Sequence, residues 1–180
     1  MARNFYISDL HLGHNNCIKF DDRPFSSVEE MNACIIANWN AVVRKEDNVF
    51  VLGDFAWNNE MGDEALKKLN GNKFLVLGNH DRPTDFMRKE FVWIQEYAEI
   101  MDEGRRVILC HYPIAHWKNA DRGAIHLYGH IHTSRDSRPF SEYRTLMRER
   151  GIPYECYNVG CMLQDYFPRT LDEIIAADRA

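Results

Sequence analysis

The stretch VFVLGD at residues 49–54 runs through four apolar side chains and ends on a glycine and an aspartate. FYIS before Asp9 and KFLVL before Gly78 repeat this pattern of a short, mostly apolar run followed by a polar motif. Near-continuous apolar runs of this length are typical of strands that are buried on both faces of a parallel sheet. The pattern therefore predicts parallel strands over residues 5–8, 49–52 and 73–77.

Helical segments are expected between these strands. Two overlapping capping boxes at residues 26–30 are followed by apolar residues at helical spacing, which predicts a helix from Val28 to about Arg44. A shorter helix is predicted over residues 60–69, and the Asn-Gly pair that follows it is a typical helix end.

The second half of the chain is richer in predicted strands. Residues 91–101 and 105–110 flank three turn-forming residues, which predicts a hairpin. Further strands are predicted over residues 125–128 and 155–159, and a final helix over residues 170–177. A βαβαβ first half with a strand-rich second half indicates an α/β sandwich, with sheet layers in the middle and helices outside.

Length and composition suit one compact domain, residues 1–180, with 45% hydrophobic and 27% charged residues. The formal net charge of −5 argues against a broadly cationic surface that coats nucleic acid.

The first residues lack the apolar core of a signal peptide, and no apolar run approaches the ~20 residues that cross a bilayer. The five cysteines form no CxxC pair, which favours free thiols in a reducing compartment. We therefore expect a cytoplasmic protein without a membrane partner.

Five polar motifs, most of them directly after an apolar run, supply carboxylates, imidazoles and one amide. In chain order they are Asp9-Leu10-His11, Gly53-Asp54, Gly78-Asn79-His80-Asp81, His111 and Gly129-His130-Ile131-His132. Residues two apart on an extended segment point to the same side, so Asp9 and His11 can converge on one point, as can His130 and His132. Open α/β sheets place their sites at the carboxyl ends of strands, where these motifs fall. The mixture of ligands suits Mn, Fe, Zn, Co or Ni better than an ion that prefers oxygen alone.

Three residues of these motifs also have a structural interpretation. Asp54 and Asp81 could cap helices, and Asn79 could be a turn residue. Five such motifs in series are hard to explain by packing, so we favour a site for two divalent cations. Two metals about 3.5–4 Å apart can activate a nucleophile, neutralise charge and assist the leaving group of a phosphate ester.

The ordered set DxH, GD, GNHD, H and GHxH resembles the calcineurin-like metallophosphoesterase superfamily. Phe55-Ala56-Trp57 after Asp54 departs from the GDxxDRG segment of protein serine/threonine phosphatases. DLHLGHNN at residues 9–16, RPF at residues 23–25 and GDFAW at residues 53–57 are instead similar to the small prokaryotic and phage-type phosphoesterases. The resemblance implies a four-layer αββα sandwich with mixed central sheets and flanking helices.

The resemblance also implies a dinuclear centre whose two ligand sets share one bridging carboxylate. The first set is Asp9, His11, Asp54 and His132, and the second is Asp54, Asn79, His111 and His130. It implies manganese as the first expectation, with iron, zinc, nickel or cobalt as alternatives. A hydroxide that bridges the metals would attack the phosphorus. His80 would be catalytic and face the substrate, with Asp81 orienting it.

Three further residues are candidate substrate contacts. His14 lies three residues beyond His11 and could line the pocket. Arg23 could be a surface charge or a guanidinium clamp for the phosphate, and His116 could contact the substrate or merely cover the site. Residues 133–153 form an insert with five arginines, either a lid or a solvated loop that contains a helix.

The sequence thus predicts a metal-dependent phosphoesterase, with a small nucleotide-like phosphodiester as the favoured substrate. A phosphomonoesterase or a nuclease is the alternative, and the negative net charge together with the lack of a recognition domain disfavours the nuclease. A non-catalytic metal-binding scaffold is less favoured because every motif position is filled.

Overall fold

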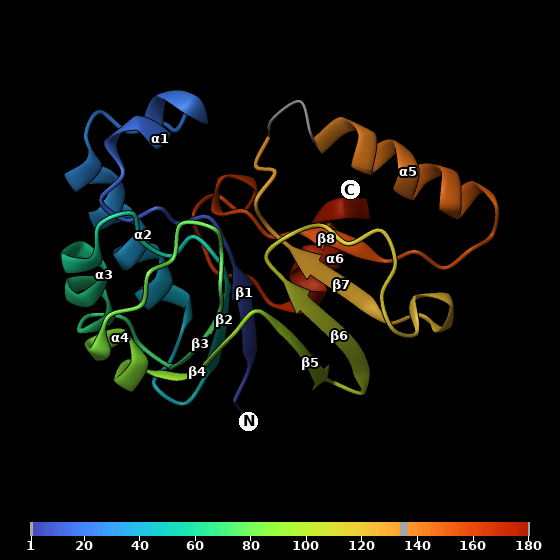
Figure 1. Cartoon of the computed structure of the whole chain (residues 1–180), viewed down its shortest axis with the longest axis horizontal. Coiled ribbons are helices and arrows are strands. Elements are labelled where there is room, and N and C mark those ends of the chain that lie inside the picture. The colour runs from blue at the N-terminus through green and yellow to red at the C-terminus, as the bar shows by residue number, and fades with distance from the viewer. Residues whose placement is uncertain (1, 134–136, 180) are drawn as a thin grey trace.

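The computed structural model describes residues 2–133 and 137–179 and contains two four-stranded sheets that pack against each other (Figure 1). The first sheet has the order β1-β2-β3-β4, and all its neighbouring strands are parallel. Its strands are β1 (Asn4–Ile7), β2 (Asn48–Leu52), β3 (Asn72–Val76) and β4 (Phe91–Gln95).

The second sheet has the order β5-β6-β7-β8. Its first pair is antiparallel and its other two pairs are parallel, so the sheet is mixed. Its strands are β5 (Tyr97–Asp102), β6 (Arg105–Cys110), β7 (Ile125–Tyr128) and β8 (Cys156–Asn158).

Helices cover the outer face of the first sheet and close one edge of the sandwich (Figure 1). Those on the outer face are α2 (Val28–Val42), α3 (Asn59–Leu66) and α4 (Asp85–Glu90). The others are α1 (Asn15–Phe20) after β1, α5 (Ser137–Glu149), α6 (Leu171–Arg179) beside β1 and β8, and the short 3-10 helices Ala120–Arg122 and Cys161–Leu163. Within residues 2–133 and 137–179, none of the helices has the length and apolar character needed to span a membrane.

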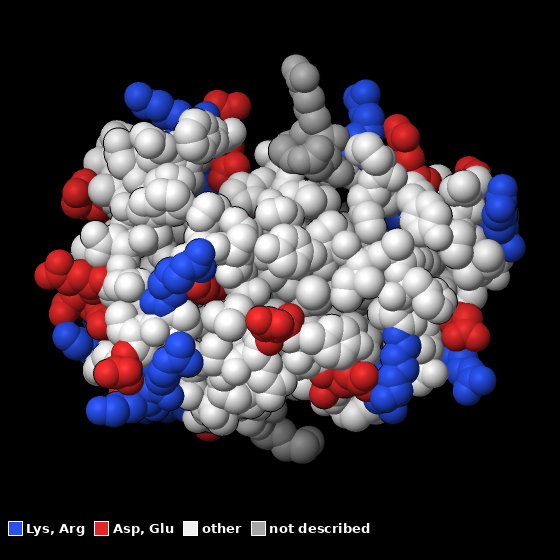
Figure 2. Space-filling model, viewed as in Figure 1, with Lys and Arg blue, Asp and Glu red and all other residues white. Residues whose placement is uncertain are grey.

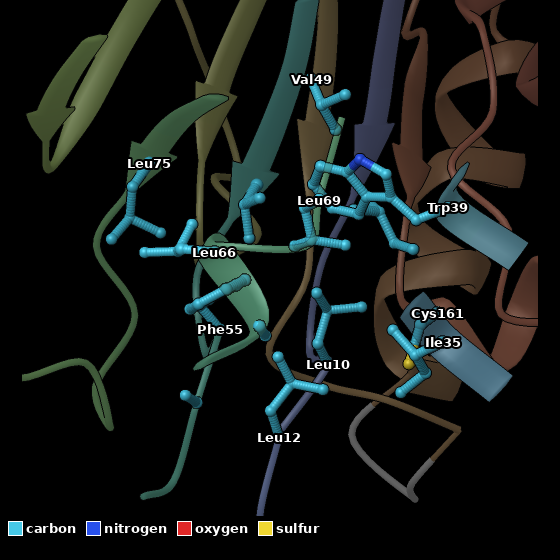
Figure 3. Packing of buried hydrophobic residues seen from close by; sticks show 14 of the residues in the cluster. Leu10, Leu12, Ile35, Trp39, Val49, Phe55, Leu66, Leu69, Leu75 and Cys161 are labelled. Atoms are coloured by element: carbon cyan, nitrogen blue, oxygen red, sulfur yellow. The ribbon is translucent and has the colours of Figure 1, made fainter. Parts of the chain in front are cut away.

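Successive side chains of β2 point alternately into two different hydrophobic cores. Val49 and Val51 belong to the core under the helices, whereas Phe50 and Leu52 belong to the core between the sheets. Figure 3 shows the helix-side core, in which Trp39 of α2 is fully buried. Both faces of the strand are therefore covered, which explains the near-continuous apolar run in the sequence.

The outer face of the second sheet is covered by the loop after β6 and by α5. The Phe140 ring packs edge-on against Tyr128 with centroids 5.1 Å apart, and the Tyr143 ring packs in the same way against Tyr154 at 5.3 Å. Helices thus lie outside both sheets, and the predicted α/β sandwich is confirmed. Residues 134–136 of the 133–153 insert, Arg135 among them, lie outside the described residues, and a lid role for the insert stays a prediction.

The single hairpin strand expected over residues 91–101 is wrong. Strand β4 ends at Gln95 in the first sheet, and β5 begins at Tyr97 in the second, so the chain crosses between the sheets at Glu96. Apolar residues continue through this crossing because Phe91 and Ala98 pack into different cores. The sequence pattern therefore contains no break to mark the change of sheet.

His126 in β7 is fully buried, and its neutral form satisfies both ring nitrogens. Its Nδ1 donates to the carbonyl oxygen of Ile108, and its Nε2 accepts from the amide of Ile114, each at 3.2 Å. A second ring proton would point at the Ile114 N–H. Burial disfavours the charged ring and lowers the pKa of His126 to about 4.

We predict that acidification from pH 7 to pH 5 destabilises the native state by about 2 kcal/mol through His126 alone. The unfolded side chain titrates near pH 6.5 and the folded one near pH 4, so the unfolded state binds more protons between these values. The stability is complete above pH 6.5 and is lost as the pH falls. Urea unfolding of the wild type and of His126→Gln, in the presence of a chelator, should show a smaller loss in the variant. Parallel pH dependences in the two proteins would contradict this role.

Candidate metal centre

The candidate ligands meet at the carboxyl ends of strands from both sheets. In chain order they are Asp9 and His11 after β1, Asp54 after β2, Asn79 after β3, His111 after β6, and His130 and His132 after β7. A parallel bridge between Ser8 and Gly160 joins β1 to the segment after β8. The ligands therefore lie at the seam between the two sheets.

Five of the seven candidate ligands have a left-handed backbone conformation. Asp9, His11, Asp54, His130 and His132 have φ values of 57°, 52°, 53°, 70° and 44°. Non-glycine residues rarely adopt this conformation because it costs free energy, and such residues cluster at functional sites. Asp9 and His11 thus converge through left-handed turns of their loop, and not through the expected extended segment.

One group of ligand atoms comes from Asp9, His11 and His132, which lie within 4.8 Å of one another. The Nε2 atoms of His11 and His132 are 3.3 Å apart, and His132 Nε2 lies 3.4 Å from Asp9 Oδ1. His132 Nδ1 donates to Asp21 Oδ1 at 2.7 Å. Burial lowers the pKa of His132, but the Asp21 and Asp9 carboxylates outweigh burial and raise that pKa to about 9. The raised pKa means that Nε2 also holds a proton near neutral pH, and a metal that binds Nε2 must displace it.

A second group comes from Asp9, Asp54 and His111. His111 Nδ1 donates to the backbone carbonyl oxygen at the end of β2 at 2.8 Å, and its Nε2 lies 3.1 Å from Asn79 Oδ1. Asp54 Oδ2 lies 3.6 Å from His11 Nε2 and 3.6 Å from His111 Nε2. This carboxylate oxygen therefore lies between the two groups, and its role as a bridging ligand stays a prediction.

The donor set fits a divalent cation in each group. Asp9, Asp54, His11 and His111 are at most 3% exposed, so water does not solvate their polar atoms. Because His111 Nδ1 carries the ring proton, its Nε2 lone pair faces the Asn79 amide oxygen. Two acceptors this close repel each other unless a proton or a cation lies between them, and a divalent cation bound to both would remove the repulsion.

His130 lies beside the second group. Its ring centroid is 5.0 Å from that of His111 and 4.6 Å from that of Tyr112. Its backbone N–H donates to both carboxylate oxygens of Asp9, at 3.1 and 3.2 Å. Each of the other six candidate ligands has a ligand atom within 3.6 Å of a ligand atom of another candidate. A ligand role for the His130 ring stays a prediction.

Arg23 supports the centre and does not form the expected anion clamp. Its side chain is 0% exposed, and the guanidinium donates to the carbonyl oxygens of Asp9 and Leu10 at 2.9 and 3.1 Å. It also donates twice to Asp21 Oδ2, at 2.9 and 3.0 Å, and Asp21 holds the ring of His132. Sequence reasoning missed Asp21 because a lone aspartate in a loop has no spacing signal.

Asp81 holds the ligand loops together, which corrects its expected role of orienting the His80 ring. In the described residues its carboxylate accepts the backbone N–H groups of Asp54, Phe55 and Gly78 at 2.9, 2.9 and 2.8 Å. These bonds join the loop after β2 to the loop after β3. Burial raises the pKa of Asp81, although the three amide donors oppose the shift.

His80 is exposed at the mouth of the site. Its backbone N–H donates to Asp54 Oδ1 at 3.0 Å, which fixes the residue relative to the second candidate carboxylate. Its ring centroid lies 5.7 Å from that of His11 and 4.9 Å from that of Trp57. The ring is thus free to meet a substrate bound over the ligand groups.

A cleft of about 320 Å³ opens over the candidate ligands. His14 and His80 line it, so His14 lies where a substrate contact is expected. His116 is exposed in the loop after β6 and is outside this lining in the part of the chain that the structure describes. The structure therefore brings His14 to the cleft and leaves His116 away from it.

We predict that Asp21→Asn weakens Mn²⁺ binding by about 10–100-fold, because a carboxylate bonded to a metal-binding imidazole raises its basicity and fixes its ring. Isothermal titration of the metal-free protein with Mn²⁺ measures the effect. Asp22→Asn is the matched control, since Asp22 is the exposed neighbour, and it should bind Mn²⁺ as the wild type does. Equal affinities of the two variants would contradict the role of Asp21.

Comparison with known proteins agrees with this geometry. The family model of the calcineurin-like phosphoesterase superfamily domain matches residues 3–148. The chain is 35% identical over 179 residues to an uncharacterized protein of Methanocaldococcus jannaschii, covering 97% of this chain and 90% of that protein. It is 29% identical over 164 residues to the gene 66 protein of Mycobacterium phage L5, covering 74% of this chain and 79% of that protein.

A solved structure extends the similarity to the fold. The crystal structure of a protein of unknown function from Aquifex aeolicus has a TM-score of 0.75 and 27% identity, and the match covers 98% of this chain and 99% of that one. The family model spans well over half of the chain, from the residues before β1 to α5. The chain therefore belongs to the calcineurin-like phosphoesterase superfamily.

Proposed function

We propose that the protein is a metal-dependent hydrolase that uses two divalent cations to cleave a small, nucleotide-like phosphodiester. The observation that carries this proposal is the convergence of two buried carboxylates and three imidazoles below one cleft, with His80 exposed beside them. Membership of the phosphoesterase superfamily supports the hydrolysis of a phosphate ester. The diester preference and the nucleotide-like substrate are the further step.

The candidate ligands would hold the two cations in sets that share Asp54. One set would be Asp9, His11, Asp54 and His132, and the other Asp54, Asn79, His111 and His130. When bound, the cations neutralise charge on the phosphate and activate water for attack on phosphorus. Manganese is the proposed metal, and iron, zinc, nickel or cobalt could use the same nitrogen and oxygen donors.

His80 would act on the phosphate from the open side of the cleft. Its exposed imidazole can donate a hydrogen bond to a phosphate oxygen and transfer a proton to the leaving oxygen. The hydrogen bond from its backbone to Asp54 holds it beside the candidate metal ligands. Asp81 would contribute indirectly, because it holds the backbone of both loops in place.

A small ester suits the site better than a nucleic acid. The cleft volume of about 320 Å³ lies at the lower end of the range for small-molecule pockets. On the face in Figure 2, Lys and Arg side chains are interspersed with Asp and Glu. A protein that binds a duplex usually carries a continuous basic surface. We therefore propose a small phosphate ester as the partner and place the nuclease second.

We predict that the Mn²⁺-loaded protein hydrolyses bis-p-nitrophenyl phosphate faster than p-nitrophenyl phosphate. Asp54→Asn should lower turnover more than about 100-fold. Changing a residue that only holds a metal ligand already costs about 10–100-fold, and Asp54 would contact both cations directly. Initial rates before and after chelation give the comparison, with Asp22→Asn as the control. A preference for the monoester would contradict the diesterase assignment. No metal-dependent activity on either ester would favour the non-catalytic scaffold.

We predict that His80→Ala lowers turnover by about 10²–10⁴-fold on diesters with poor leaving groups and by less on activated diesters. A good leaving group departs without a proton, whereas a poor one needs the acid. The measurement is kcat against leaving-group pKa for a series of aryl and alkyl diesters. His116→Ala, outside the cleft, should retain wild-type rates. Equal losses across the series would assign His80 to charge stabilisation alone.

A further inference from the structure

Three aromatic side chains contact one another beside the cleft, and we call them the aromatic rim (His14, Phe20 and Trp57). His14 and Phe20 line the cleft, and Trp57 packs against His14 and His80 just outside that lining. Trp57 is 51% exposed and Phe20 is 77% exposed. The His14 and Trp57 rings stack with centroids 4.1 Å apart and an interplanar angle of 8°. The Phe20 ring meets His14 edge-on at 6.3 Å. The exposed rings of Phe20 and Trp57 therefore flank His14 on its side of the cleft.

The backbone fixes the aromatic rim relative to the metal ligands. A parallel bridge joins the loops after β1 and β2, and the Trp57 N–H donates to the Leu12 carbonyl oxygen at 3.0 Å. Gly13 has a φ of 81°, and a Cβ atom there would lie 2.9 Å from the Asn58 side chain. Glycine thus lets the two loops approach closely, which brings His14 against Trp57.

The aromatic rim lies where a nucleobase of the substrate could stack. Stacking on an aromatic side chain suits any nucleobase, because every base has a π-face. The Trp57 ring lies 4.9 Å from the His80 ring. Under the proposed function His80 meets the leaving oxygen, so a ring attached through that oxygen lies within reach of the aromatic rim.

We propose that the aromatic rim binds the nucleobase of the substrate, on the leaving-group side of the metal centre. This inference rests on the proposed function, which places the phosphate over the ligand groups. The aromatic rim then selects nucleoside esters over esters of aliphatic alcohols. Trp57 supplies the stacking face, and His14 supports it from the ligand loop.

The test compares two phosphates that differ only in the base. Titration calorimetry of the Mn²⁺-loaded protein should give an affinity for adenosine 5′-monophosphate about tenfold higher than that for ribose 5-phosphate. Trp57→Ala should remove this difference and leave ribose 5-phosphate binding unchanged. Trp57→Phe, which keeps a ring, should retain most of it. Tyr97→Ala, which removes an exposed aromatic side chain on β5 of the second sheet, is the control and should retain all of it.

The outcomes separate this inference from the proposed function. Equal affinities for the two compounds, or a preference that survives Trp57→Ala, would overturn the role of the aromatic rim while the phosphate site stands. Quenching of tryptophan fluorescence by the nucleotide in the wild type, but not in Trp57→Phe, would support direct stacking on Trp57. Failure of both compounds to bind would count against the phosphate site, and therefore against both proposals.

Discussion

The burial of two carboxylates at the seam between the sheets is the constraint that shapes this structure. Asp9 and Asp54 are 0% and 2% exposed, and buried like charges are costly unless donors or cations compensate them. Part of the compensation is built into the backbone, since the amides of His130 and His80 donate to these two carboxylates. His130 supplies its amide from a left-handed backbone conformation, and the imidazoles around the carboxylates complete the candidate site for cations.

The strands and the ligand motifs could be predicted because both depend on local patterns. Strands β1, β2 and β3 lie within one residue of their predicted bounds, and β7 has the predicted bounds without any shift. The crossing at Glu96 could not be predicted in this way, because apolar side chains are needed on both sides of it. Which sheet a strand joins depends on pairing with strands that are distant in the chain, and the local sequence pattern does not identify those strands.

Side-chain roles were harder to predict than side-chain positions. An arginine after a ligand loop could bind a phosphate or hold the loop, and only its complete burial assigns Arg23 to the second role. Asp81 lies next to His80 in the sequence, yet its carboxylate turns toward backbone amides. The stacking of His14 on Trp57 joins residues from two loops, so neither motif alone predicts it.

The division of the ligands between the sheets also orders the assembly of the site. Asp9 and His130 are 121 residues apart in the chain, and contacts of such long range form late and slowly. During synthesis the first sheet, with Asp9, Asp54 and Asn79 at its edge, emerges well before β6 and β7. A nascent chain therefore presents three oxygen donors and one imidazole, that of His11, before His111, His130 and His132 emerge. The candidate site gains most of its nitrogen donors only when the second sheet docks, so the complete donor set forms late in the folding of this protein.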